Sequence, residues 1–232
     1  MFVKLQKYEP LNPVFPRGFS EQPGKFVFPL EKVRILEPWM GVSAVNKRTV
    51  ALTTDQYKSI ISTIKKGFLN HRPNERIATA LMLEANLGLR ISDILKLHLS
   101  DIIKDGGRYR LAIIEQKTGK ARNFTVPLAL FQFIRCYCLD NGITADERIF
   151  PVSERAVQKL LGQACDYLGI RGVGTHSFRK FYATEIYKDS GYNILLVQQL
   201  LQHSSPSVSQ AYIGIQQKEI ETAIEGHLKL DV

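Results

Sequence analysis

The sequence predicts a mainly α-helical domain that carries a small antiparallel β-sheet, an α+β fold. After residue 49, apolar side chains recur at helical spacing along most of the chain. Two short runs, 109–115 and 122–126, flank the turn segment QKTGKA and are typical of a β-hairpin. With 232 residues, 44% of them hydrophobic, the chain can bury a core in one large domain.

The N-terminal stretch differs from the rest. Six of the ten prolines lie within residues 1–38, and proline disfavours helix in the residue before it. Residues 1–48 also carry eight Lys or Arg against four Asp or Glu, a net charge of +4. Two interpretations stay open: a disordered leader, or a basic arm that contacts nucleic acid or a partner subunit.

The helices follow from local signals. Thr53 precedes Gln56 by three residues, which indicates a capping box at the start of the first helix. A second helix spans 75–87 and ends near Gly88, and Thr175 is expected to cap a later one. Further helices are predicted near 128–140, 153–168, 177–188, 193–202, 206–213 and 217–228.

Composition narrows the class of partner. A net charge of +9 and a pI of about 9.5 indicate a polyanion. There is neither an apolar run of about 18 residues nor a secretory leader, so we expect a cytoplasmic protein with no membrane partner. The cysteines (Cys136, Cys138 and Cys165) are odd in number and lack zinc-finger spacing, which favours reduced thiols on helices and no metal site.

Six residues form a candidate phosphoryl-transfer site. Two guanidiniums can hold a phosphate, imidazoles and a lysine can donate protons, and a tyrosine hydroxyl can form a covalent intermediate. They occur in the contexts GLRISDILKL, EQKTGKARNFTVPL, THSFRKFYATEIY and LLQHSSPSVSQAYIG. The six are Arg90, Lys117, His176, Arg179, His203 and Tyr212.

Each residue taken alone has an ordinary structural explanation, and some have rivals. Asp93 is placed to orient Arg90. Lys120 lies in the same turn as Lys117, which we favour because it is nearer the strand. Tyr182 and Tyr187 compete with Tyr212 as nucleophile, but they share a helix whose face is expected to be packed.

In order and spacing, these motifs resemble the catalytic domain of the tyrosine recombinase (phage integrase) family. The resemblance covers roughly residues 49–215. It comprises G-L-R-x-S-D, K-T-G followed by V-P-L, H-x-x-R, and L-x-H-S-S leading to a tyrosine. It implies the fold of that catalytic domain, and chemistry on DNA that needs no metal ion or cofactor.

The resemblance also implies a role for each residue. Tyr212 would attack a phosphodiester and leave a 3′-phosphotyrosyl enzyme with a free 5′-hydroxyl. Arg90 and Arg179 would clamp the non-bridging oxygens, and Lys117 would protonate the departing 5′-oxygen. The two histidines would donate hydrogen bonds or transfer protons, and Asp93 would brace the active-site arginine or histidine.

The implied protein is a site-specific recombinase or integrase of a mobile genetic element. Its expected partners are double-stranded DNA with inverted-repeat sites and an accessory or directionality protein. Four copies of the chain would form a tetramer on the DNA. The DNA-bound protein would be associated with the nucleoid. Residues 1–48 are too short for the family's N-terminal core-binding domain, so the chain is either a single-domain member of the family or a fragment of a longer protein. We therefore expect a catalytic domain over 49–232, with a helix at 218–230 that docks on a neighbouring subunit.

Two other functions stay open. A type IB topoisomerase uses a similar residue set to relax supercoils, although the histidine in HSFR and the residues around it favour a recombinase. The other is a DNA-binding regulator that has kept the fold and lost catalysis. Every expected catalytic position is filled, which argues against it.

Overall fold

A computed structural model describes residues 49–213, and these form a helical domain with one small sheet. The predicted arm at 1–48 and the predicted helix at 218–230 lie outside the described residues. The elements in chain order are α1 (Thr54–Lys66), α2 (Glu75–Leu87), α3 (Ile91–Ile94), η1 (Leu99–Asp101), β1 (Ile102–Asp105), β2 (Arg108–Ile114), β3 (Ala121–Val126), α4 (Leu128–Asp140), α5 (Glu154–Tyr167), α6 (Thr175–Asp189), α7 (Ile194–Leu201) and α8 (Pro206–Ile213).

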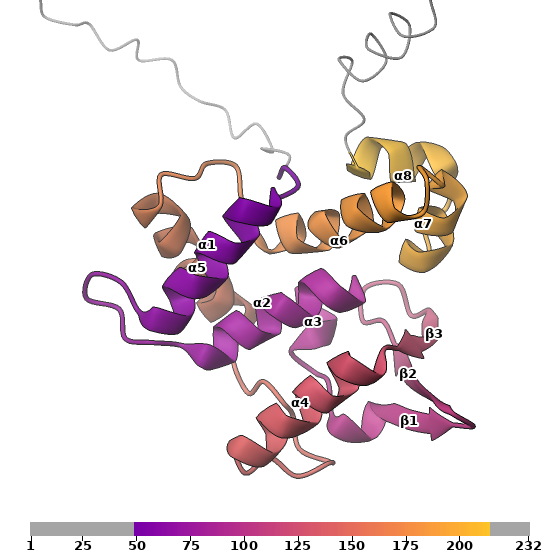
Figure 1. The fold of residues 1–232 in the computed structure, drawn as a ribbon, viewed down its shortest axis with the longest axis horizontal. Coiled ribbons are helices and arrows are strands. Elements are labelled where there is room, and N and C mark those ends of the chain that lie inside the picture. The colour runs from indigo at the N-terminus through magenta and orange to yellow at the C-terminus, as the bar shows by residue number, and fades with distance from the viewer. Residues whose placement is uncertain (1–48, 214–232) are drawn as a thin grey trace, which may run out of the picture. The chain divides into compact units, whose positions relative to one another are not determined.

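Most of the helices gather around α2, whereas the sheet and α4 lie together to one side of them (Figure 1). Helix α2 packs against α1 and α6, while α7 and α8 pack on each other and on α6. Nine of the thirteen residues of α2 are buried, which explains why its sequence is apolar on nearly all sides. Phe178 of α6 is fully buried in the same core.

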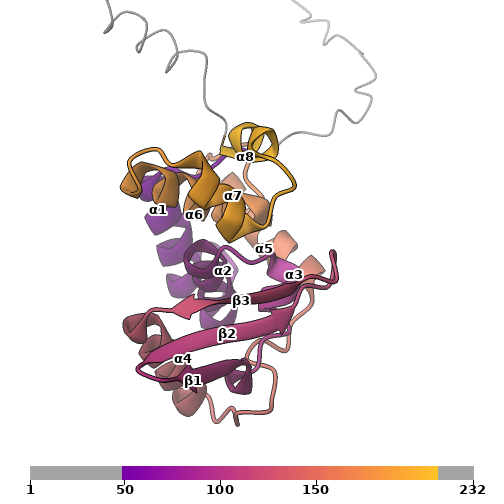
Figure 2. The ribbon, with the colours of Figure 1, turned by 90° about the vertical axis from the view of Figure 1, so that its right-hand side faces the viewer.

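The sheet has the order β1-β2-β3 with both pairs antiparallel, and Leu111 of β2 faces Ile102 on one side and Phe124 on the other. Figure 2 shows the three strands side by side, with β3 on the side of α2 and α7 and with α4 behind the sheet. The sequence predicted β2 and β3 but missed β1. In this four-residue edge strand only Ile102 is buried, so it carries too little hydrophobic pattern to be recognised.

The sequence predicted N-caps at Thr53 and Thr175, and the structure confirms the first of them. The Thr53 hydroxyl accepts from the Gln56 N–H at 3.2 Å and the Gln56 side chain accepts from the Thr53 N–H at 3.0 Å, so the capping box is confirmed. The prediction that Thr175 caps α6 was wrong. Gly174 is the cap, and Thr175 is the first helical residue with its side chain buried.

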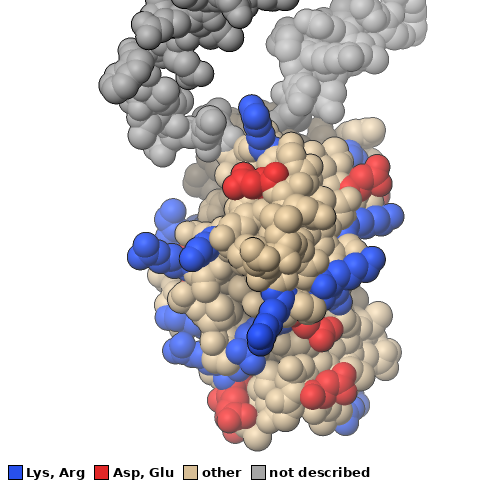
Figure 3. All heavy atoms as spheres, turned by 90° about the vertical axis from the view of Figure 1, so that its left-hand side faces the viewer, with Lys and Arg blue, Asp and Glu red and all other residues tan. Residues whose placement is uncertain are grey.

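On the face seen in Figure 3, basic side chains lie mainly toward the left and right margins, with acidic side chains among them and uncharged residues over most of the middle. None of the described helices combines the length and the apolar character that crossing a bilayer requires.

Gly88 sets the turn between α2 and Arg90. Its φ is +61°, and a Cβ there would lie 2.4 Å from ring carbons of Tyr182. We expect Gly88→Ala to lower the free energy of unfolding by about 1–2 kcal/mol because of the left-handed backbone. Displacing the Tyr182 ring should lower it by about 1–3 kcal/mol more. Urea unfolding of the full chain measures both.

Gly142→Ala is the matched control, because Gly142 has φ +65° and nothing near its Cβ position. The free energy of unfolding of this variant should fall only by the amount that the left-handed backbone accounts for. Equal losses in the two variants would contradict a special role for the Gly88–Tyr182 approach.

Candidate active site

Arg90 and Arg179 converge from different elements on one carboxylate. Arg90 caps α3, and its NH1 donates to Oε2 of Glu115 at 2.6 Å. Arg179 lies on α6, where its NH1 is 4.0 Å from Oε1 of Glu115 and its NH2 donates to the carbonyl of Leu201 at 3.2 Å. The Arg179 side chain is 2% exposed and that of Arg90 is 18% exposed, so the clamp opens to solvent on the Arg90 side.

A third arginine joins this group. Arg122 of β3 is buried, with its Nε 3.5 Å from Oε1 of Glu115, and its NH1 donates to the carbonyl of Leu200. The side chain of Gln202 also donates to the carbonyl of Ala121 at 3.0 Å. These two contacts attach the start of β3 to the end of α7 and so bring the hairpin to the helical group.

The turn that carries Lys117 is held by two acidic side chains. Thr118 donates through its hydroxyl to Oε2 of Glu115 at 2.7 Å, and the N–H of Gln116 donates to Oδ1 of Asp93 at 2.9 Å. Lys117 itself is exposed, as is its rival Lys120. A fixed turn thus presents a lysine to solvent beside the arginines.

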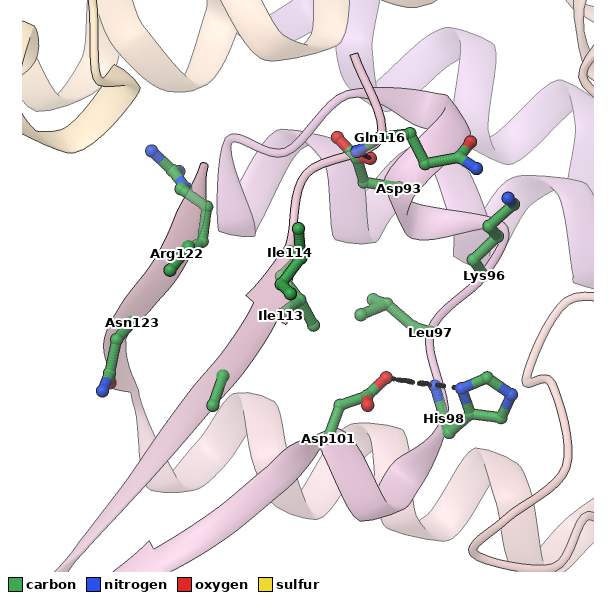
Figure 4. A pocket seen from close by; sticks show the side chains of 12 residues that line it. Asp93, Lys96, Leu97, His98, Asp101, Ile113, Ile114, Gln116, Arg122 and Asn123 are labelled. Carbon is green, nitrogen blue, oxygen red and sulfur yellow. Dashed lines mark hydrogen bonds and ion pairs between the residues drawn. The ribbon is translucent and has the colours of Figure 1, made fainter. Parts of the chain in front are cut away.

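The predicted contact between Asp93 and Arg90 was wrong. Asp93 is buried under the end of β2, where its Oδ1 accepts from the backbone N–H of Gln116 at 2.9 Å (Figure 4). The carboxylate that orients Arg90 is Glu115, which the sequence analysis missed. Its signal was weak, since it is a single acidic residue at the end of a strand.

His176 lies in the first turn of α6, on the exposed side of the arginines. Partial desolvation lowers its pKa, and the positive charges of Arg179, Arg90 and Lys117 lower it further. These cations therefore lie close enough to His176 to act on it. Its neutral form is favoured, which can accept a proton as well as donate a hydrogen bond.

His203 follows α7, and its Nδ1 lies 3.0 Å from the hydroxyl of Ser209. Burial and the nearby arginines, Arg179 first, lower the pKa of His203 to about 4. The ring is therefore neutral near pH 7, and Nε2 is the nitrogen left for a ligand. Ser209 was also missed by the sequence analysis, because a serine on a helix carries no distinctive pattern.

Tyr212 lies on α8, one turn after Ser209. The Tyr212 ring meets the His203 ring edge-on, with the ring centroids 5.0 Å apart. On α6, the Nζ of Lys180 lies 5.4 Å from the centroid of the Tyr212 ring. Burial raises the pKa of Tyr212 to about 12 although Arg179 opposes the shift. Its hydroxyl is buried and makes no hydrogen bond of ordinary geometry with the described residues.

The rival tyrosines lie in other surroundings. Tyr182 packs over Gly88, and burial raises the pKa of its hydroxyl. Tyr187 meets Tyr192 edge-on with ring centroids 5.3 Å apart. Neither ring contacts His203 in the way Tyr212 does.

Two pockets flank the hairpin. One of about 710 Å³ lies between its tip and α7 and is lined by Lys120, Gln199 and His203 among others. The other, of about 560 Å³, lies between the sheet and the segment after α3, with Asp93 and Gln116 at one end and the His98–Asp101 pair at the other (Figure 4). None of the six candidate residues lines the second pocket, so the hollow next to the site is the first one.

Among the described residues, no three or more His, Cys, Asp or Glu are grouped to hold a metal ion.

The sequence profile of the phage integrase family matches residues 51–219. The chain belongs to this family.

Similar proteins agree with this assignment. The chain is 31% identical over 170 residues to the probable integrase/recombinase YoeC of Bacillus subtilis, covering 70% of this chain and 90% of that protein. It is 28% identical over 184 residues to the tyrosine recombinase XerA of Pyrococcus furiosus, covering 75% and 60%. It spans about half the length of other Xer relatives, such as the XerC of Caldanaerobacter subterraneus at 51%.

Solved structures show the same fold. XerH recombinase bound to palindromic difH DNA aligns with a TM-score of 0.59 at 18% identity, over 79% of this chain and 55% of that one. The catalytic domain of bacteriophage HP1 integrase aligns with a TM-score of 0.54 at 17% identity, over 77% and 95%. The predicted fold class, a tyrosine recombinase catalytic domain, is confirmed.

The environment of His203 in this integrase-family domain predicts a low titration midpoint. In the unfolded chain a histidine titrates near pH 6.5, and in the folded domain near 4, so the unfolded chain binds more protons between these values. Stability should therefore fall as the pH falls from about 6.5 towards 4. Imidazole NMR of the full chain, assigned with His203→Gln, gives the midpoint directly. A midpoint above 6 would contradict the buried placement of the ring.

Proposed function

We propose that this chain is a site-specific DNA recombinase that cleaves and rejoins strands through a 3′-phosphotyrosyl intermediate. The observation that carries the proposal is the meeting of Arg90, Arg179 and Tyr212, which are far apart in sequence. Arg90 directly precedes α3, and the other two lie on α6 and α8. Burial raises the pKa of the Tyr212 hydroxyl, and the positive charge of Arg179 opposes this shift. A phosphate held by the two arginines would thus lie next to the nucleophile.

In the proposed reaction, the hydroxyl oxygen of Tyr212 forms a bond to phosphorus as the bond to the 5′-oxygen breaks. Arg90 and Arg179 hold the non-bridging oxygens, where negative charge increases in the transition state. Lys117 gives its proton to the departing 5′-oxygen, and the exposed hairpin turn allows it to reach the DNA. Rejoining reverses these steps on another strand, so the phosphotyrosine bond conserves the energy of the original link.

The neutral histidines suit the remaining tasks. The hydrogen bond between Ser209 and Nδ1 of His203 leaves Nε2 to donate to a phosphate oxygen, if the serine donates to the ring. His176, which is exposed and has a lowered pKa, would donate a hydrogen bond or accept a proton around the phosphate. Asp93 acts on the site through the backbone of Gln116.

We further propose double-stranded DNA with inverted-repeat sites as the partner, and a tetramer on two paired sites as the active assembly. The net charge of +9 and the DNA-bound XerH complex support the first point. Residues 1–48, with their net charge of +4, would add contacts to the phosphate backbone as an arm beside the catalytic domain. The helix predicted at 218–230 would link neighbouring subunits.

A nicked suicide duplex separates the candidate functions. Inverted repeats around a short spacer in the DNA flanking the gene supply the test site. A recombinase forms a covalent adduct only at that site, a type IB topoisomerase forms adducts on many sequences, and a regulator forms none. Adducts on unrelated duplexes, or none at all, would overturn the proposal.

Tyr212→Phe should abolish the covalent adduct and leave site binding within about threefold of wild type, because a single hydroxyl is removed. A denaturing gel and a mobility-shift assay measure the two quantities. Tyr182→Phe is the matched control and should still form the adduct. An adduct in the Tyr212 variant would transfer the nucleophile role to another tyrosine.

Lys117→Ala should slow cleavage by about 10²–10⁴-fold, as expected for loss of a general acid. A substrate whose bridging 5′-oxygen is replaced by sulfur should restore most of this loss, since a thiolate leaves without a proton. Lys120→Ala is the control and should gain nothing from the sulfur. The opposite pattern would assign the proton donor to Lys120.

A further inference from the structure

Glu115 is the acceptor on which the positive charges of the site converge. Within the described residues, its carboxylate lies 2.6 Å from Arg90, 3.5 Å from Arg122 and 4.0 Å from Arg179. No other described carboxylate forms an ion pair with any of these arginines. Three guanidiniums in so small a volume repel one another, and burial makes each charge more costly. Glu115 is thus the counter-ion that allows the cluster to form.

The carboxylate lies behind the arginines and not in the open part of the site. Its side chain is 1% exposed, whereas that of Arg90 is 18% exposed. A phosphate approaching from solvent would therefore meet Arg90 without displacing Glu115. The Arg179 side chain lies deeper, at 2% exposed, and it acts on the Tyr212 hydroxyl, so the part of the clamp open to solvent is Arg90.

The same carboxylate also holds the turn of the proposed proton donor. Oε2 of Glu115 accepts from both Arg90, at 2.6 Å, and the hydroxyl of Thr118, at 2.7 Å. The backbone of Glu115 closes the turn, since its N–H donates to the carbonyl of Lys120 at 2.9 Å and its carbonyl accepts from Gly119 at 2.8 Å. One oxygen atom therefore fixes the position of Arg90 relative to that of the Lys117 turn.

We propose that Glu115 is a positioning residue for the cleavage step, acting through Arg90 on the phosphate clamp and through Thr118 on the Lys117 turn. This inference rests on the proposed function. It assigns no contact between Glu115 and DNA. Its effect should appear in the rate of cleavage and not in the affinity for the site.

Glu115→Gln tests the charge, because the amide keeps the shape of the side chain and removes the counter-ion. Loss of one charge-assisted hydrogen bond should slow single-turnover adduct formation about 10–100-fold. Site binding should stay within about threefold of wild type, because phosphate affinity depends mainly on the cations. Cleavage at the wild-type rate, or a loss of binding as large as the loss of cleavage, would overturn the inference.

Glu84→Gln is the matched control. Glu84 is a fully buried glutamate on α2 that also interacts with Arg179, but it makes no hydrogen bond to the clamp. Burial raises its pKa well above the ordinary value, so replacing it removes less charge. Its cleavage rate should stay close to wild type. A defect equal to that of Glu115→Gln would show that any buried glutamate near Arg179 has this effect, and would overturn the inference.

Thr118→Val provides an independent measurement if Glu115→Gln folds poorly, because Thr118 is exposed and its replacement leaves the core intact. It removes the hydrogen bond from the turn and leaves the contact between Glu115 and Arg90. Cleavage of the ordinary duplex should slow about 5–10-fold, the value of one net hydrogen bond. The duplex with bridging 5′-sulfur should be cut at the wild-type rate, since its leaving group needs no proton. A wild-type rate on the ordinary duplex, or an equal defect on both duplexes, would overturn the part of the inference that concerns the turn.

The wild-type protein distinguishes the two levels of the argument. If it forms no adduct with any duplex, the proposed function fails and Glu115 has no cleavage step to support. If it forms the adduct and the Glu115 and Thr118 variants match it, the proposed function stands and the inference about Glu115 fails.

Discussion

A buried positive charge needs a compensating negative one, and in this domain the carboxylate of Glu115 meets that need for Arg90, Arg122 and Arg179. Burial and the repulsion of neighbouring arginines lower the pKa of Arg179 and of Arg122, and the charge of Glu115 opposes both shifts. The elements that supply these residues, α3, α6 and β3, are separated along the chain. The ion pairs therefore also define how the hairpin meets the helices.

The rest of the fold keeps this meeting point rigid. Helix α2 packs between α1 and α6, and Gly88 allows the chain to turn at once from α2 into Arg90 while Tyr182 lies against the turn. On the other side, contacts from Arg122 and Gln202 attach the start of β3 to the end of α7. Arg90 is thus fixed by packing, the Lys117 turn by hydrogen bonds, and Tyr212 by its place on α8, which packs on α6 and α7.

The sequence predicted the features that local pattern determines. The helices repeat apolar residues at regular spacing. The motifs around Arg90, Arg179, His203 and Tyr212 are each weak alone, and they become specific through their order and spacing along the chain. Edge strand β1 was missed because only one of its residues is buried. Glu115 was missed for a different reason. Its importance arises from Arg90, 25 positions earlier, and from Arg179 on a distant helix, and spacing in sequence gives no information on such contacts. Asp93 was assigned to the wrong partner because proximity along the chain favoured Arg90, whereas the fold places it under Gln116.

The protonated state of Tyr212 has a consequence for the cell that contains this protein. With its pKa raised to about 12, the phenol is almost entirely uncharged at physiological pH and is a poor nucleophile. If Tyr212 is the nucleophile, as proposed, each attack outside the target site would leave a strand break with protein attached to it. A buried and protonated hydroxyl would make such attacks rarer before any base sequence is recognised.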